Sequence, residues 1–222
     1  MGTGKQDKAV RREAEIASDG KKVRGTLVLP AGCAAVVVFA HGSGSSRFSP
    51  RNLYVARVLE QSRLGTLLID LLEEDEAEDR ACVFDIDLLA RRLRSAADWL
   101  ASQRETRELR LGYFGASTGA AAALLAAAWA PDRVAAIVSR GGRPDLAGQS
   151  LSRVTAATLL IVGGDDEIVL ELNREAHALL RCPRQLAVIP GATHLFSEPG
   201  ALEEVARLAE EWFLRYLAQT PE

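Results

Sequence analysis

Short apolar runs alternate with longer amphipathic runs along most of this chain. The run 35–40 is Val-rich and shows no polar alternation, as expected of a strand buried on both faces of a sheet. A similar run at 66–71 predicts a second buried strand. Further strands are predicted at 109–114, 134–138, 158–162 and 185–189.

Helical spacing of apolar residues separates these strands. Helices are predicted at 50–64, 85–100, 120–129, 171–180 and 199–217. Strands that alternate with helices predict an α/β fold, with a mostly parallel sheet covered by helices on both faces.

The N-terminal region departs from this alternation. Two runs at 12–17 and 23–29 flank Asp19-Gly20, a dipeptide typical of hairpin turns, and predict an antiparallel hairpin at the edge of the sheet. No repeat or linker divides the chain, so we expect one domain over residues 1–222, with residues 1–11 flexible.

Ligands of such sheets bind beyond the carboxyl ends of the strands. Four segments directly after predicted strands carry reactive or glycine-rich sequence: 40–46, 115–119, 162–169 and 190–194. The second, Gly-Ala-Ser-Thr-Gly, lies between a strand and a helix, the context of a nucleophile elbow. Its glycines remove the β-carbons that would collide in so sharp a turn, and Ser117 becomes the candidate nucleophile.

Composition limits the partners. The chain has 222 residues, of which 48% are hydrophobic and 26% charged, and its formal net charge of −3 gives no reason to expect nucleic acid. No apolar run is long enough to predict a membrane span, and the polar start lacks a secretory signal, so we expect a cytoplasmic location. The three cysteines are far apart and show no metal-ligand spacing, so we expect free thiols and no metal.

A serine hydroxyl needs a base within hydrogen-bond reach to become a strong nucleophile. Among three histidines, His194 follows the last predicted strand and is the candidate base, whereas His177 lies inside a predicted helix and is expected only to pack there. An acid must orient the imidazole, and Asp165 and Asp166 compete for this role, with Asp145 as a more distant alternative.

With these residues in the chain order Ser, Asp, His, the sequence resembles the α/β-hydrolase superfamily, and within it the small, capless enzymes of the dienelactone hydrolase family. The resemblance extends from the first hairpin to the last helix. It implies the α/β-hydrolase fold without a cap domain, and an open site that favours small soluble esters. The family pattern Gly-x-x-Asp-x-x-Val matches Gly163, Asp166 and Val169, which favours Asp166 as the acid.

The oxyanion hole needs two backbone N–H groups aimed at the developing negative charge. Thr118, directly after the nucleophile, is predicted to supply one, and Ser43 the other. Gly42 and Gly44 give the loop around Ser43 the freedom to approach the substrate, and His41 is expected to position that loop.

Charged residues occur near the same strand ends. Arg140 and Arg143 follow the strand at 134–138 and are candidates to bind a substrate carboxylate or phosphate, although pairing with Asp145 would explain an arginine equally well. The acidic run 73–79 is expected mainly to be a solvated loop.

The sequence therefore predicts a serine hydrolase that cleaves small carboxylic esters through an acyl-enzyme, without metal or organic cofactor. Its expected partner is a small-molecule ester, with no nucleic acid and no membrane, and a homodimer is left open. Acyl transfer, perhydrolysis or lactone hydrolysis by the same residues are alternatives. Namesake dienelactone hydrolases carry a cysteine in place of Ser117, which disfavours the namesake reaction. An alternative of another class is a non-catalytic binding module with this fold.

Overall fold

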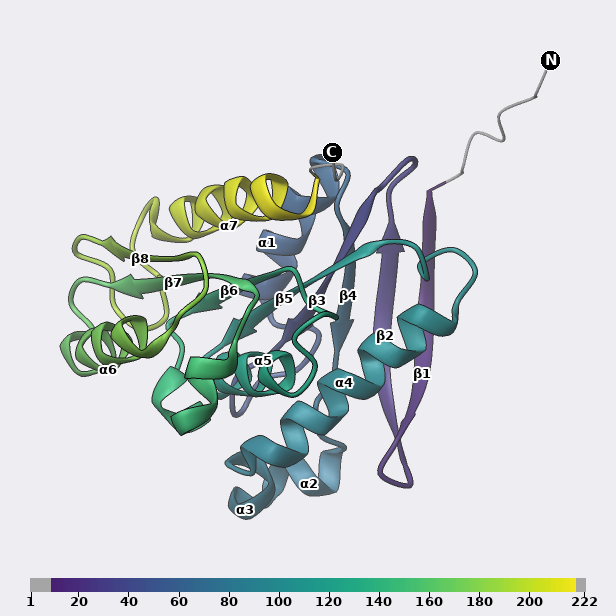
Figure 1. Ribbon diagram of the computed structural model, residues 1–222, viewed down its shortest axis with the longest axis horizontal. Coiled ribbons are helices and arrows are strands. Elements are labelled where there is room, and N and C mark those ends of the chain that lie inside the picture. The colour runs from purple at the N-terminus through teal and green to yellow at the C-terminus, as the bar shows by residue number, and fades with distance from the viewer. Residues whose placement is uncertain (1–8, 219–222) are drawn as a thin grey trace.

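Eight strands form one sheet in the order β1-β2-β4-β3-β5-β6-β7-β8 in the computed structural model, which describes residues 9–218 (Figure 1). Strands β3 to β8 run parallel, and β1 and β2 form the antiparallel hairpin at one edge. The bounds are β1 (Val10–Ser18), β2 (Lys21–Leu29), β3 (Ala35–Ala40), β4 (Gly65–Ile69), β5 (Arg110–Ala116), β6 (Ala136–Arg140), β7 (Ala157–Gly163) and β8 (Arg184–Ile189). The predicted fold class is confirmed.

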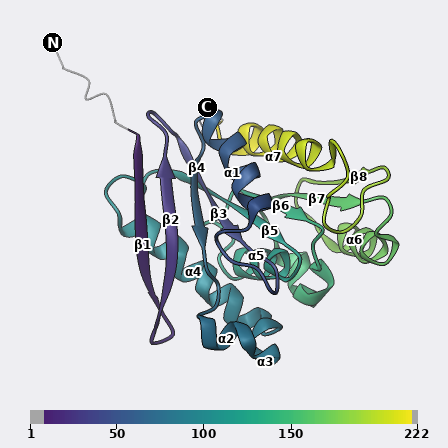
Figure 2. The ribbon, with the colours of Figure 1, turned by 180° about the vertical axis from the view of Figure 1, so that it is seen from behind.

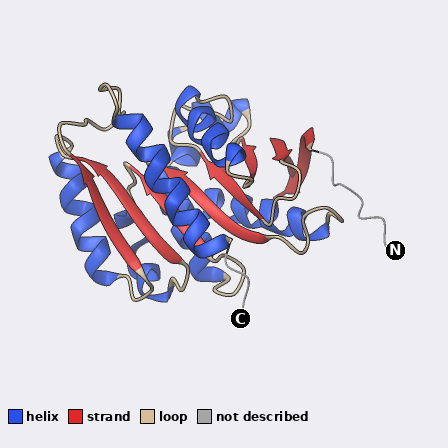
Figure 3. Cartoon of the chain, turned by 90° about the horizontal axis from the view of Figure 1, so that it is seen from above, coloured by secondary structure: helices blue, strands red, loops and turns tan. Residues whose placement is uncertain are grey.

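Helices cover both faces of this sheet, as Figure 3 shows from above. One face carries α1 (Pro50–Gln61) and α7 (Ala201–Leu217), and the other carries α4 (Ile86–Ser102), α5 (Thr118–Trp129) and α6 (Glu167–Leu179). The connections include the short helices α2 (Glu74–Glu78) and α3 (Arg80–Val83), and the 3-10 segment η1 (Pro144–Arg153). Figure 2 shows the same arrangement from behind.

Strand β3 is an example of how the sheet is buried on both faces. Its side chains alternate between the two faces, so Val36 and Val38 pack with α4 and α5 while Val37 and Phe39 pack with α1 and α7. The Phe39 ring stacks on Phe114 of β5 with ring centroids 4.8 Å apart. This packing fixes the ends of β3 and β5 relative to each other.

Two expectations need correction. Residues 1–8 of the segment expected to be flexible lie outside the described residues, but Val10 and Arg11 belong to β1, where Val10 pairs with Leu29. The acidic run is also not simply a solvated loop. It forms α2, in which Glu76 caps the helix start and its carboxylate accepts hydrogen bonds from Arg92 at 2.6 and 2.7 Å.

In the part of the chain that the structure describes, no helix combines the length and the apolar character needed to cross a membrane.

Candidate active site

Ser117 lies in a strained turn between β5 and α5. Its backbone has φ +50° and ψ −122°, a combination that costs a residue with a side chain about 1–3 kcal/mol. The turn leaves no space for β-carbons on either side: one added at Gly115 would lie 2.7 Å from the Ala120 nitrogen, and one at Gly119 would lie 2.5 Å from the His41 carbonyl oxygen. The elbow geometry predicted for this motif is therefore present.

His194 and Asp166 are brought together from loops after β8 and β7. His194 Nδ1 lies 2.7 Å from Asp166 Oδ2, and the Asp166 side chain is only 15% exposed while that of His194 is 40% exposed. A carboxylate on Nδ1 holds the proton there and leaves Nε2 free to accept another.

The competing acids have other roles. Asp165 is exposed, and its backbone N–H donates to the Ala192 carbonyl at 3.0 Å, which ties the β7 loop to the loop that carries His194. Asp145 accepts two hydrogen bonds from Arg143, at 2.8 and 2.7 Å. The choice of Asp166 over both thus agrees with the geometry.

Ser117 is hydrogen-bonded to the last residue of β6, close to His194. The Ser117 N–H donates to the Arg140 carbonyl at 3.4 Å, and a β-carbon on the next residue, Gly141, would lie 3.5 Å from His194 Cε1. Within residues 9–218 no hydrogen bond joins the Ser117 hydroxyl to His194. Catalytic hydrogen bonds are commonly long before substrate binds.

The loop after β3 lies against Ser117 from the other side. A β-carbon added at Gly42 would lie 2.9 Å from Ser117 Cβ, and Gly44 has φ +66°, which favours glycine. Thr118 is the first residue of α5, so its N–H has no acceptor within the helix. The loop around Ser43 and the start of α5 thus adjoin one another at Ser117.

His41 holds this loop in place. It is 7% exposed, its Nδ1 lies 2.9 Å from the Gly42 carbonyl, and its Nε2 accepts the Leu71 N–H at 3.0 Å. An acceptor role for Nε2 requires the neutral ring with its proton on Nδ1. Burial lowers the pKa of His41, which favours the same neutral form. The geometry agrees with the predicted positioning role.

The two candidate arginines differ. Arg143 is occupied by Asp145, as the alternative interpretation required. Arg140 is 7% exposed and has no carboxylate partner among the described residues; its guanidinium lies over the Phe196 ring, 5.7 Å from the centroid. Burial lowers its pKa to about 10, and the nearby Arg51 adds to the effect. At neutral pH the group therefore remains a cation.

The sequence analysis did not predict two residues whose hydrogen bonds support the site, Glu198 and Asn173. Glu198 accepts from the Thr193 N–H at 3.1 Å and from the Thr193 hydroxyl at 2.6 Å, which shapes the turn around His194. Asn173, fully buried in α6, donates to the carbonyls of Gly142 and Val169 at 2.9 and 2.8 Å. A polar residue on the apolar face of a predicted helix was the available signal for Asn173.

The remaining histidine and the cysteines lie outside this arrangement. His177 is a half-buried residue of α6, and burial together with Arg184 lowers its pKa. Cys82 and Cys182 are free thiols.

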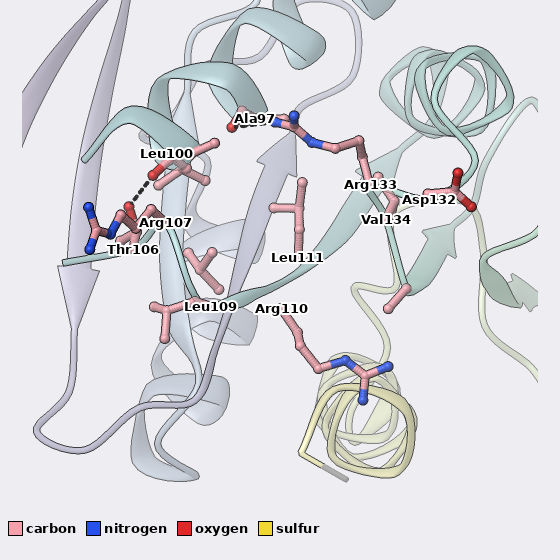
Figure 4. Close-up of a pocket in the computed structure, with 13 residues that line it drawn as sticks. Ala97, Leu100, Thr106, Arg107, Leu109, Arg110, Leu111, Asp132, Arg133 and Val134 are labelled. Carbon is pink, nitrogen blue, oxygen red and sulfur yellow. Dashed lines mark hydrogen bonds between the residues drawn. The ribbon is translucent and has the colours of Figure 1, made fainter. Parts of the chain in front are cut away.

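Hollows lie at both ends of the sheet in the part of the chain that the structure describes. One of about 20 Å³ adjoins Thr118 and the loop 41–45, which we call the oxyanion loop after its predicted role. It opens beside a groove of about 780 Å³ between that loop, the start of β2 and α2. Another, of about 430 Å³, lies at the opposite end of the sheet, where Leu100, Leu111 and Val134 form its floor (Figure 4). At its rim, Arg133 donates to the Ala97 carbonyl and pairs with Asp98.

Comparison with known proteins bears on this site. The model of the dienelactone hydrolase family matches residues 71–219, which include Ser117, Asp166 and His194. The chain belongs to the dienelactone hydrolase family. A crystal structure of a dienelactone hydrolase from Anabaena variabilis is similar over 95% of this chain and 99% of that one, with 53% sequence identity and a TM-score of 0.92.

Other relatives of this family member are more distant or longer. Est1E from Butyrivibrio proteoclasticus shares the fold, with a TM-score of 0.79 over 93% of this chain and 99% of that one, at 18% identity. A Mycobacterium tuberculosis protein with the provisional name of phosphoribosyl transferase is 57% identical over 205 residues, which are 92% of this chain and 46% of that protein. The chain thus spans about half the length of the curated relatives that it matches most extensively.

Proposed function

We propose that this hydrolase cleaves small carboxylic esters through an acyl-enzyme formed on Ser117. The observation that carries the proposal is the 2.7 Å contact between His194 Nδ1 and the Asp166 carboxylate, beside a serine held in an elbow. Asp166 fixes the imidazole so that its Nε2 accepts a proton, and Ser117 is the hydroxyl that can supply one.

In the first half-reaction, Ser117 Oγ attacks the ester carbonyl carbon and its proton passes to His194 Nε2. The carbonyl oxygen becomes an oxyanion that accepts hydrogen bonds from the Ser43 and Thr118 N–H groups. The tetrahedral intermediate collapses, the bond from carbon to the leaving oxygen breaks, and the imidazolium gives its proton to that oxygen. The products are the alcohol and the acyl-enzyme.

In the second half-reaction, water replaces the alcohol. His194 takes a proton from the water as its oxygen attacks the acyl carbon, the same N–H groups stabilise the oxyanion, and the proton returns to Ser117 Oγ as the acyl bond breaks. The carboxylic acid is released and the serine is restored. The half-exposed position of His194 supports this step, because water can reach Nε2.

The Mycobacterium tuberculosis relative raises the question of phosphoribosyl transfer. We assign any such activity to the part of that protein outside the matched 46%, because Ser117, His194 and Asp166 form a set suited to acyl transfer. Incubation of this chain with phosphoribosyl diphosphate and a purine base should give no nucleotide, and nucleotide formation would contradict the assignment.

A fluorophosphonate probe tests the nucleophile. We expect the folded protein to be labelled at Ser117, the Ser117→Ala variant to remain unlabelled, and p-nitrophenyl acetate hydrolysis to fall by about 10⁴-fold or more in that variant. A folded protein that neither reacts with the probe nor hydrolyses any ester would refute the proposal and favour a binding module. Addition of an alcohol or peroxide, followed by product analysis, separates hydrolysis from acyl transfer or perhydrolysis.

A further inference from the structure

The hollow of about 20 Å³ lies where one part of an ester substrate must go. Its walls are the oxyanion loop, Thr118 and a group of side chains from the β4 side of the sheet. These side chains are Leu71, Leu72, Ala77, Val83 and Leu89. A volume near that of one water-sized sphere holds a methyl group and little more.

The strand order shows which part of the substrate points there. The oxyanion loop follows β3 and the hollow extends toward β4, whereas His194 and Asp166 follow β8 and β7, on the other side of β5. During hydrolysis the leaving oxygen must lie near His194 Nε2, which protonates it. With the carbonyl oxygen at the Ser43 and Thr118 amides, which border one side of the hollow, the acyl substituent points away from His194 and toward the side chains of Val83 and Leu89 on its other side.

The walls of the hollow are fixed in place. Leu71, Val83 and Leu89 are all less than 9% exposed. Arg92 of α4, which is 1% exposed, donates to the Leu71 carbonyl at 2.9 Å and pairs with Glu76 of α2, so it ties the acidic helix to the floor. Figure 1 shows α2 and α3 beside the lower end of α4.

A longer acyl chain would have to continue into the neighbouring groove of about 780 Å³. The groove and the hollow share His41, Ser45, Leu72 and Ala77. Seven of the groove's lining residues are charged: Lys22, Arg24, Arg47, Asp70, Glu73, Glu74 and Asp75. Phe48, Leu72 and Ala77 also line the groove, but methylene groups in it would displace water from more charged side chains than apolar ones.

We propose that the acyl group of the substrate is acetyl-sized, and that Val83 and Leu89 set this limit. The inference rests on the proposed ester hydrolysis and names its substrate class: acetate esters, with the variable part of the molecule on the alcohol side. The tight hollow and the charged groove beyond it both act against longer alkyl chains.

The test is an acyl-length series of p-nitrophenyl esters. We expect kcat/KM to be highest for acetate and lower by about 10-fold or more for butyrate and octanoate, the scale on which a pocket rejects extra methylenes. Val83→Ala should raise the ratio of kcat/KM for butyrate to kcat/KM for acetate several-fold. The matched control is Val188→Ala on the exposed part of β8, which should change neither.

A second variant tests the inference even if Val83→Ala fails to fold. Ala77 is exposed on α2 and lines both the hollow and the groove, so Ala77→Leu should fold normally and widen the preference for acetate over butyrate. Higher kcat/KM for butyrate or octanoate than for acetate in the parent protein would overturn the inference while the esterase proposal stands. Absence of both probe labelling and ester hydrolysis would overturn the two together.

Discussion

The histidine on the β3 side of Ser117 is buried, and the histidine on the β7 and β8 side reaches solvent, so we call these the buried side and the exposed side of the site. His41, which holds the oxyanion loop, is 7% exposed, whereas the side chain of His194 is 40% exposed. Fixed N–H dipoles stabilise a developing charge best where water is excluded. A proton carrier has the opposite need, because leaving groups and water must reach it. The burial of the two histidines thus matches the two tasks that we propose for them, positioning of a loop for His41 and proton transfer for His194.

Asp166→Asn should give the largest effect on the exposed side. An amide at this position no longer favours the tautomer with the proton on Nδ1, so kcat for p-nitrophenyl acetate should fall by about 10⁴-fold. The control is Asp165→Asn, one residue away and exposed, which should change kcat at most a few-fold. A greater loss from Asp165→Asn would reverse the assignment of the acid.

Gly42→Ala tests the buried side. The added methyl would lie 2.9 Å from Ser117 Cβ, so the loop must move away and take the Ser43 N–H with it. Loss of one oxyanion donor lowers kcat by about 10² to 10³-fold. Gly44→Ala is the control: its φ of +66° makes alanine strained, but nothing lies within 4 Å, so stability should fall more than kcat. Equal loss of kcat in both variants would contradict the predicted displacement.

His41→Ala should act on stability and its dependence on pH. The change leaves the buried Leu71 N–H without its acceptor, at a cost of about 1–3 kcal/mol in the free energy of unfolding. Burial lowers the pKa of His41, so its contribution is present above the unfolded pKa of about 6.5 and is lost as pH falls through the lower folded value. Denaturant titrations should therefore show a smaller difference between parent and variant at pH 5.5 than at pH 7.5.

A difference that grows toward pH 5.5 would contradict the neutral state of His41. His41→Gln is the conservative variant, because its side-chain oxygen can accept the Leu71 N–H. It should recover part of the stability and show less change with pH.

Glu198→Gln should give the smallest effect. Its bonds to Thr193 shape the turn around His194 at the protein surface, where water can replace them. We expect kcat to fall only a few-fold, with thermal stability nearly unchanged. Glu203→Gln in the first turn of α7 is the control. A loss of kcat as large as that of Asp166→Asn would mean that water cannot replace the hydrogen bonds between Glu198 and Thr193.

The sequence allowed prediction of the strands and of the residues at their ends, because both depend on local patterns. The run 35–40 and the motif around Ser117 each carry their own signal within a few residues. The helical state of the acidic run has a local signal in the capping pair Glu73 and Glu76, but its burial depends on a partner sixteen residues away, the buried Arg92 that pairs with Glu76.

The states of the two arginines and the start of β1 could not be predicted from local patterns either. Arg143 and Arg140 looked alike as candidates, and only the structure shows that one is paired with Asp145 while the other is buried without a carboxylate. Val10 joins β1 because Leu29 of the partner strand extends that far and completes the pairing. Such choices depend on residues distant in the chain.

The backbone of Ser117 has a thermodynamic consequence. At φ +50° and ψ −122°, glycine would be relaxed where serine is strained, so Ser117→Gly should relieve some of the roughly 1–3 kcal/mol held in the turn. The inactive protein would then resist heat better than the active one. Selection of this hydrolase for thermal resistance alone would therefore favour loss of the proposed nucleophile, so activity has to be measured alongside melting temperature.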